Sequence, residues 1–229
     1  MAHILDNMIW NALATGNRNI AVVNNGVGRY LPDIAPFAAI KEPGESNLEK
    51  LYEFISTGDT IALSSLEKIN YDDRKWQVNQ SMDVTQMLYL HPVRAFCTES
   101  SGLITPLTDI HIPQMLNLTS ITKPGPFLEH TILFGNYFGI FKDEKLIAMT
   151  GQRMHPVPYM EVSAVCTHPD HQGKGYAKTL MLHVMKIILD NSFVPFLHVL
   201  TSNITAIRLY ESIGFQKRKQ LFIDVLERL

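Results

Sequence analysis

The chain contains 229 residues, and 20 lysines and arginines against 22 aspartates and glutamates give it a formal charge of −2. Hydrophobic residues make up 46% and charged residues 18% of the composition, which excludes a disordered or collagen-like chain. A charge near zero argues against a general nucleic-acid binder, because such a protein carries a basic surface. The sequence shows no signal-peptide pattern and no apolar run long enough to span a membrane, so we expect a cytoplasmic protein without a membrane partner.

Short helices and strands alternate over the first hundred residues. Apolar spacing predicts a helix at residues 6–13 and another at residues 46–56, with Ser46 as its N-cap. The expected strands are residues 19–23, 36–40, 60–63 and 83–90. We place a boundary at Ser100-Ser101-Gly102, which divides the chain into an amino-terminal α/β lobe (residues 1–100) and a second domain (residues 101–229).

The second half has a clearer pattern of apolar periods and turns. The predicted strands are residues 137–141, 146–153, 159–167, 196–200 and 221–226, and the predicted helices are residues 109–118, 177–188 and 205–213. An antiparallel meander followed by a strand–loop–helix–strand unit is an α+β layout.

A glycine-rich loop, His168-Pro-Asp-His-Gln-Gly-Lys-Gly-Tyr-Ala177, joins a predicted strand to a predicted helix. Gly173 and Gly175 allow unusual backbone angles, and the first N–H groups of the helix are free to bind an anion. The loop spells neither GxxxxGK[ST] nor GxGxxG, which excludes the common ATP and NAD sites. Coenzyme A, which also carries a pyrophosphate, fits such a loop, although a glycine-rich turn of this kind can also be purely structural.

A second motif follows the next predicted strand. Asn203, Ala206 and Tyr210 are spaced to share one helix face, Gly214 is placed to end the helix, and Phe215 returns to the core. Together with Gln172-x-x-Gly175-x-Ala177, this segment resembles the GCN5-related N-acetyltransferase (GNAT) superfamily over residues 103–229. The first hundred residues resemble the additional lobe of its glycine N-acyltransferase-like branch, a degenerate half of the same fold.

The resemblance implies the GNAT fold, a mixed and mostly antiparallel sheet flanked by helices, with acetyl-CoA as co-substrate. Main-chain groups before the loop would bind the pantetheine arm, main-chain N–H groups of the loop would bind the pyrophosphate, and Asn203 would face the arm. The side chains of Gln172 and Lys174 would lie near the pyrophosphate or simply in solvent. The implied cofactor-binding residues are Val165, Cys166, Thr167, Gln172, Gly173, Lys174, Gly175, Tyr176, Ala177 and Asn203.

Two residues are candidates for catalysis. Tyr210 matches the general acid of the family, although its ring could instead pack in the core. Period-two alternation in the strand at residues 159–167 puts Met160, Val162, Ala164 and Cys166 on one apolar face and Glu161 on the other. Glu161 stands where histone-type members have their base, and we expect desolvation to raise its pKa. Alternatively, Glu161 forms a surface salt bridge, and ordered water acts as the base.

The predicted function is therefore N-acyl transfer from acetyl-CoA to a primary amine by direct attack in a ternary complex. A backbone N–H near Val165 would polarise the carbonyl. The acceptor would be a small-molecule amine or a peptide, and the protein a monomer or homodimer. Two alternatives are a catalytically silent acyl-CoA-binding module and a protein lysine or N-terminal acetyltransferase. The two cysteines, Cys97 and Cys166, form no CxxC pair, so no metal is expected.

Overall fold

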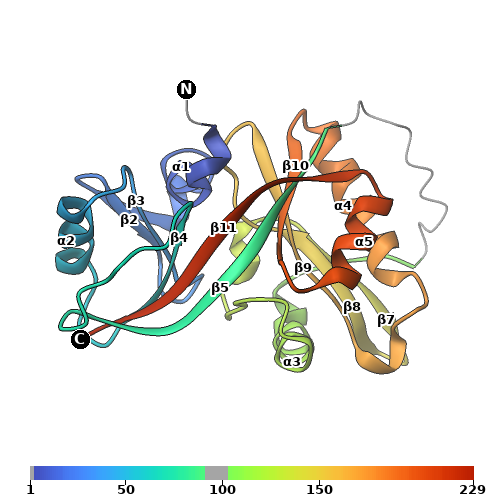
Figure 1. Ribbon diagram of the computed structural model, residues 1–229. Coiled ribbons are helices and arrows are strands. Elements are labelled where there is room, and N and C mark those ends of the chain that lie inside the picture. The colour runs from blue at the N-terminus through green and yellow to red at the C-terminus, as the bar shows by residue number, and fades with distance from the viewer. Residues whose placement is uncertain (1–2, 91–102) are drawn as a thin grey trace.

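A computed structural model describes residues 3–90 and 103–229. In this part of the chain, eleven strands form one sheet in the order β1-β2-β3-β4-β11-β5-β10-β9-β8-β7-β6. Neighbouring strands are antiparallel except β3 with β4 and β9 with β10. Helices cover the sheet, so the expected α+β class is confirmed (Figure 1). The predicted boundary at Ser100-Ser101-Gly102 falls outside the described residues, and the division into two domains stays a prediction.

The helices and strands have the following bounds. The helices are α1 (Met8–Ala14), α2 (Glu45–Phe54), α3 (Ile112–Thr122), α4 (Tyr176–Asp190) and α5 (Ile204–Ser212). The strands are β1 (Ala21–Asn24), β2 (Val27–Tyr30), β3 (Phe37–Ile40), β4 (Thr60–Ser65), β5 (Trp76–Tyr89), β6 (Thr105–Leu107), β7 (Tyr137–Lys142), β8 (Lys145–Gln152), β9 (Tyr159–Thr167), β10 (Val194–Leu200) and β11 (Phe215–Arg228).

The first lobe contains β1 to β4 with α1 and α2. Strand β2 was not predicted, because all four of its residues are buried and the sequence therefore shows no alternation. Helix α2 begins one residue earlier than expected. Its N-cap is Gly44, with a φ of 139°, and the prediction of Ser46 as the N-cap is wrong.

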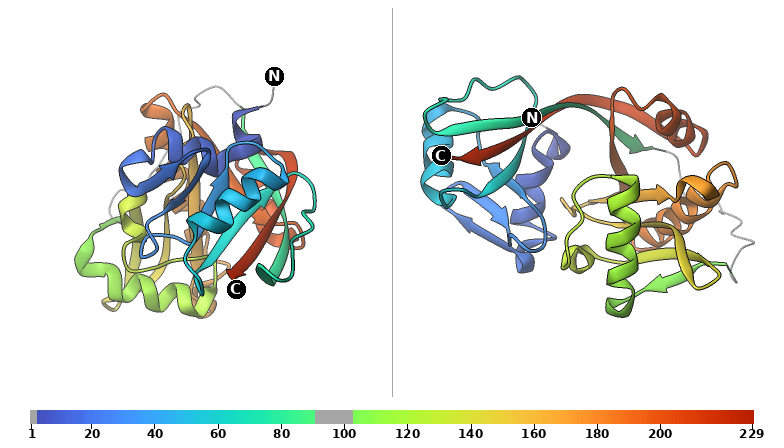
Figure 2. Two further views of the ribbon diagram at one scale, coloured as in Figure 1. Left: turned by 90° about the vertical axis from the view of Figure 1, so that its left-hand side faces the viewer. Right: turned by 90° about the horizontal axis from the view of Figure 1, so that it is seen from below.

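The second lobe contains β6 to β10 with α3, α4 and α5. Helices α3 and α4 lie on opposite faces of β8 and β9, and each has its own core cluster (Figure 2). Apolar residues of α4 such as Leu180 and Met181 are fully buried in one cluster, and Met115 and Leu118 of α3 are buried in the other. Strands β8 and β9 are thus covered on both sides.

Strands β5 and β11 run side by side from one lobe to the other (Figure 1). Both are longer than the predicted residues 83–90 and 221–226, because their additional residues are largely polar and exposed and carry no apolar period. Strand β11 also pairs with β4 along Phe222–Glu227, so residues far apart in sequence complete the sheet of the first lobe.

A third core cluster holds the two lobes together. It contains α1 residues such as Leu13, together with Phe196 of β10 and Leu221 of β11. None of the helices in the described ranges is long and apolar enough to cross a lipid bilayer.

Candidate active site

The parallel strands β9 and β10 separate halfway along their length. They pair from Tyr159 with Val194 to Glu161 with Phe196, and no pairing follows in the described chain. Beyond this point β10 stays bonded to β5, and β9 stays bonded to β8. The edge of β9 that faces β10 is therefore free to accept an extended ligand as an added strand.

The backbone of β9 is interrupted at Ala164, which has a φ of 52° in mid-strand. The register with β8 shifts by one residue here, which marks a β-bulge. Met160 and Val162 consequently pack with Val165 in the α4 cluster, whereas Ala164 and Cys166 pack in the α3 cluster. The prediction that Met160, Val162, Ala164 and Cys166 share one face is wrong, because strict alternation ends at the bulge.

The last residues of β9 lie inside this opening. Val165 and Thr167 are half-buried, and the hydroxyl of Thr167 has no hydrogen-bond partner within residues 3–90 and 103–229. Cys166 is buried, and burial raises the pKa of its thiol to about 11. Cys166 is therefore a protonated core thiol at neutral pH.

The loop after β9 forms a cradle of main-chain N–H groups at the start of α4. Gly175 is the N-cap with a φ of 80°, and Gly173 has a φ of 75°. A Cβ added at either glycine would have no described atom within 4 Å, so both face open space. Tyr176 and Ala177 are the first residues of the helix, and within the described chain no acceptor is bonded to their N–H groups. Such an arrangement binds anions.

The side chains around this cradle contribute less to it than the main-chain N–H groups do. Gln172 is exposed, and its amide donates only a long hydrogen bond of 3.5 Å to the carbonyl of Thr167. Lys174 is exposed as well. Asn203 is the N-cap of α5, where its Oδ1 accepts a hydrogen bond of 3.1 Å from the N–H of Ala206. The observed role of Asn203 is therefore to begin the helix that carries Tyr210.

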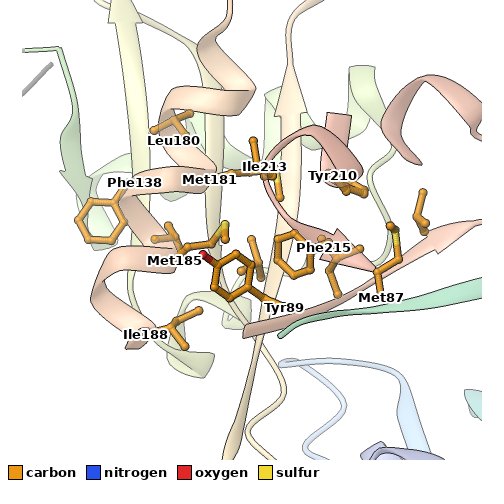
Figure 3. Close-up of a cluster of buried hydrophobic side chains, with 14 of the residues drawn as sticks. Met87, Tyr89, Phe138, Leu180, Met181, Met185, Ile188, Tyr210, Ile213 and Phe215 are labelled. Atoms are coloured by element: carbon orange, nitrogen blue, oxygen red, sulfur yellow. The ribbon is translucent and has the colours of Figure 1, made fainter. Parts of the chain in front are cut away.

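Tyr210 lies on α5 at the edge of the α4 core cluster (Figure 3). Its ring packs at 6.4 Å from the ring of Phe215, so the residue has the core contacts that we considered as an alternative. Burial raises the pKa of the phenol to about 12, and the nearby Cys166 adds to this shift. Tyr210 is therefore protonated at neutral pH, which is the state that a general acid requires.

The pKa of Glu161 is not shifted in the direction that we expected from the sequence. The residue is fully buried, and Arg153 donates to both of its oxygens, from Nε at 2.8 Å and from Nη2 at 2.9 Å. His198 Nδ1 and the N–H of Met154 also donate to it, at 2.7 and 3.3 Å. Burial alone would raise the pKa of Glu161, but Arg153 and His198 outweigh it and hold the pKa far below its ordinary value. The expected raised pKa is therefore wrong.

The contacts of Glu161 continue into a buried polar network that reaches the first lobe. Gln86 of β5 donates from Nε2 to the carbonyl of Leu5 and to Nε2 of His198, each at 3.0 Å. Its Oε1 accepts from Arg218 of β11 at 2.5 Å, and Arg218 also binds Asp6. Since the Gln86 oxygen accepts from Arg218, the Gln86 amide nitrogen is the group that faces His198 Nε2. These hydrogen bonds hold β9 against β10 and β5.

A crevice with no room for a water molecule lies beside the bulge, on the α3 side of β9. Its wall comes from the 124–126 turn, from Phe127 and Thr131, and from strand residues Tyr137, Arg153, Ser163 and Ala164. Arg153 presents its third nitrogen, Nη1, to the 124–126 turn, since a Cβ built on Gly125 would lie 3.9 Å from it. The Arg153 guanidinium also lies 4.9 Å from the ring centre of Phe37, which belongs to the first lobe.

Sequence reasoning missed Arg153, Tyr137 and His198. Two signals were available. Arg153 ends the predicted strand at residues 146–153, next to the strand that carries Glu161, so opposite charges on neighbouring strands could have been paired. His198 interrupts the apolar run Phe196-Leu-His-Val-Leu200, which indicates a polar partner inside the core.

Comparison with known proteins agrees with this geometry. The family model described as FR47-like protein matches residues 137–223. A solved structure from Novosphingobium aromaticivorans, described as an acetyltransferase of the GNAT family, superposes with a TM-score of 0.91 at 32% identity and covers 100% of both chains. A GCN5-related N-acetyltransferase from Kribbella flavida has the same fold, with a TM-score of 0.61, 13% identity and coverage of 99% of this chain and 96% of that one.

A curated relative matches over a shorter segment. The mycothiol acetyltransferase of Thermomonospora curvata is 36% identical over 77 residues, which are 33% of this chain and 26% of that protein. The alignment therefore spans about a quarter of the relative, whereas the Novosphingobium structure matches over the full length of this chain. From the full-length match at 32% identity, the chain belongs to the GNAT family of acetyltransferases.

Proposed function

We propose that the protein transfers an acetyl group from acetyl-CoA to a primary amine by direct attack in a ternary complex. The observation that supports this most is the opening between β9 and β10, which ends at the N–H cradle of α4. The free edge of β9 fits the pantetheine arm, and the cradle fits a pyrophosphate. Acetyl-CoA, when bound, supplies the thioester carbon that the amine attacks.

The cofactor contacts follow from this placement. We assign the arm to main-chain groups of Val165, Cys166 and Thr167, and the pyrophosphate to N–H groups of the loop. The side chains of Gln172 and Lys174 add charge and hydrogen bonds at the mouth of the cradle. The residues whose N–H groups face the pyrophosphate are Gly173, Lys174, Gly175, Tyr176 and Ala177.

Two groups of this chain act on the reacting atoms in the proposal. The N–H of Val165, which follows the bulge at Ala164, polarises the thioester carbonyl as it becomes an oxyanion. The Tyr210 hydroxyl donates its proton to the departing thiolate, and the raised pKa keeps that proton in place until then. The amine loses its proton to ordered water.

Glu161 has a different role from the one that the family resemblance implies. Both of its oxygens are taken by Arg153, and His198 and the Met154 N–H add further hydrogen bonds. A carboxylate with such a low pKa is a weak base. We propose that Glu161 is a positioning residue, which holds Arg153 at the crevice and the first half of β9 against β10.

The test is release of coenzyme A thiol from acetyl-CoA over a panel of primary amines, with the wild-type protein and Tyr210→Phe. We expect the phenylalanine variant to bind acetyl-CoA in a thermal-shift assay but to lose about 100-fold or more in kcat, the usual contribution of a general acid. Tyr71→Phe, which alters a hydroxyl in the first lobe, is the control. Binding of acetyl-CoA without thiol release from any amine would favour the catalytically silent module.

The remaining alternatives differ in the class of amine that accepts the acetyl group. A protein lysine or N-terminal acetyltransferase would release thiol with peptides and not with small amines, so the panel includes both. Assignment to the glycine N-acyltransferase-like branch, a cytoplasmic location and a monomeric or homodimeric state stay predictions.

A further inference from the structure

One stretch of β5 has a neighbouring strand on only one side. Strand β11 pairs with β5 along Trp76–Tyr89, whereas β10 pairs only with residues 84–88. The N–H of Thr201 donates to the carbonyl of Asp83 at 2.9 Å, directly after β10 ends. From residue 77 to residue 82, no strand in the described part of the chain pairs with the side of β5 that faces away from β11 (Figure 1). This open edge therefore has main-chain N–H and C=O groups available to an added strand.

The open edge differs from the two outer margins of the sheet. Strand β1 at one margin is four residues long, and β6 at the other is three residues long and contains Pro106. Short strands and proline are common means by which proteins protect a sheet edge from strand addition. Residues 77–82, Gln-Val-Asn-Gln-Ser-Met, contain neither a charged residue nor proline, and all but Met82 are exposed. The open edge is thus longer than either margin and lacks their protection.

Two hollows lie beside this edge, on one face of the sheet. Strand β5 has one extra residue, Asn79, against β11, and this bulge puts Val78 on the same face as Ser81 and Asp83. The acidic hollow, of about 270 Å³, lies between the 68–71 turn and the strand residues Val78, Ser81, Asp83, Phe222 and Asp224. The second hollow, of about 480 Å³, includes the apolar side chains of Ile69, Trp76 and Val78 in its wall. A strand added to the edge would project alternate side chains toward this face.

The acidic hollow favours a cationic side chain. Asp224 is only 6% exposed, and its oxygens accept hydrogen bonds from the hydroxyls of Tyr71 at 2.9 Å and Ser81 at 2.6 Å. Within residues 3–90 and 103–229, neither Asp224 nor Asp83 forms an ion pair, although Lys68 lines the same hollow. A buried carboxylate without a counter-charge is costly, so a cation that enters the hollow would be stabilised.

We propose that the open edge of β5 binds an extended peptide segment of a partner protein as an added strand, with a lysine or arginine side chain of that segment in the acidic hollow. Main-chain hydrogen bonds along residues 77–82 supply affinity, and the two carboxylates select the cationic side chain. A second copy of this chain fits the edge less well, because its residues 77–83 contain no lysine or arginine and would bring a second Asp83 to the interface. The surface lies outside the residues that we assign to acetyl-CoA, so binding tests it without reference to turnover.

The experiment uses a peptide library with lysine fixed at the centre of chains about nine residues long and mixed residues, cysteine and proline excepted, at the other positions. The library is passed over the immobilised full-length protein, and retained peptides are sequenced, resynthesised and titrated by fluorescence anisotropy. We expect Kd to rise at least about tenfold when the central lysine is replaced by norleucine or by glutamate.

Methylation of the peptide backbone separates strand addition from binding through side chains alone. In an added strand every second main-chain N–H points to β5, and the others point away from it. N-methylation of one alternate set of residues should therefore abolish binding. N-methylation of the other set should change Kd by less than about threefold.

A variant of the protein tests the acidic hollow. Asp83→Lys places a positive charge at the edge and should raise the Kd of the lysine peptides at least about tenfold. Asp190→Lys is the matched control, because it makes the same change of charge at an exposed position at the end of α4 and should bind as the wild type does. Circular dichroism checks that both variants fold, and the methylated peptides decide the question if Asp83→Lys does not.

Retention of no peptide, equal effects of the two methylated sets, or unchanged binding by folded Asp83→Lys would overturn the proposal. Free lysine amide that binds as tightly as the peptides would also overturn it, because the hollow would then bind a small cation without a strand. A wild-type dimer in sedimentation that Asp83→Lys dissociates would assign the edge to a second copy instead. The proposed acetyl transfer stands in each of these cases, since it depends on the opening between β9 and β10.

Discussion

Arg153 binds Glu161 along one edge of its guanidinium, through Nε and Nη2, and leaves Nη1 facing the 124–126 turn. This buried charge pair thereby links β9, in the core of the sheet, to the turn that follows α3.

Glu161→Gln should strongly destabilise the fold. The substitution leaves the Arg153 charge buried without its counter-charge, and breaking one partner of a buried pair typically costs about 3–5 kcal/mol. The measurement is urea unfolding at neutral pH. Glu49→Gln is the control, because Glu49 pairs with Lys75 at the surface and exposed pairs contribute about 0–1 kcal/mol. Equal losses in the two variants would show that the buried pair adds nothing.

The stability contributed by ionised Glu161 should vanish in acid. Its pKa is lowered in the folded protein, so the contribution is complete above the ordinary value of 4.5 and is lost as the pH falls from there toward the folded value. The difference in unfolding free energy between the wild type and Glu161→Gln should therefore be constant from about pH 8 to about pH 5 and shrink below about pH 4. A difference that changes near neutral pH would mean a raised pKa and would restore Glu161 as a candidate base.

Gly175→Ala should weaken acetyl-CoA binding more than it weakens the fold. A side chain at a φ of 80° costs about 1–2 kcal/mol in stability, and the added Cβ projects into the open space of the cradle. Gly58→Ala is a matched control, with a φ of 82° and equally open surroundings in the first lobe. Calorimetric titration with acetyl-CoA should show a higher Kd for Gly175→Ala alone. Identical affinities would place the pyrophosphate elsewhere.

Gly151→Ala should destabilise the fold through Tyr137. The new Cβ would come within 2.2 Å of a ring atom, and overpacking of this kind costs about 1–3 kcal/mol. In Gly139→Ala the Cβ would come within 2.4 Å of a Leu146 methyl carbon, which has more freedom to turn. We expect Gly151→Ala to lower the unfolding temperature more than Gly139→Ala does. The measurement is thermal unfolding of both variants, and equal losses would show that the Tyr137 ring can move aside.

Cys166 should resist alkylation in the folded protein. Its thiol is buried and its pKa is raised to about 11, so almost no thiolate is present near pH 8. Peptide mass spectrometry after iodoacetamide treatment should find Cys166 modified only in denaturant. Rapid modification of the folded protein would mean that the thiol is accessible from the cofactor opening.

The cradle and α5 were predictable because their signals are local. Gly173 and Gly175 mark a turn that needs positive φ, and the spacing from Asn203 to Gly214 gives a helix its cap and its end. The observed α5, Ile204–Ser212, differs from the predicted residues 205–213 by one residue at each end. Patterns within about ten residues therefore defined these parts of the site.

The charge network could not be derived in the same way. Arg153, Glu161 and His198 come from three strands, and their contacts depend on the register between those strands. The bulge at Ala164 reverses the alternation of side chains between the two faces of β9. No residue type in the sequence marks the bulge. Strand β6 was not predicted from the sequence, because its three residues are too few to show an apolar period.

The sharing of β11 between the lobes has a consequence for biosynthesis. Residues 215–228 pair with β4 on one side and β5 on the other, and Leu221 is buried in the cluster that joins the lobes and Leu226 in a cluster of the first lobe. Until the ribosome has released this segment, β4 and β5 expose unpaired edges to other nascent chains. The sheet of the first lobe can therefore be completed only after residues 215–228 have been synthesised.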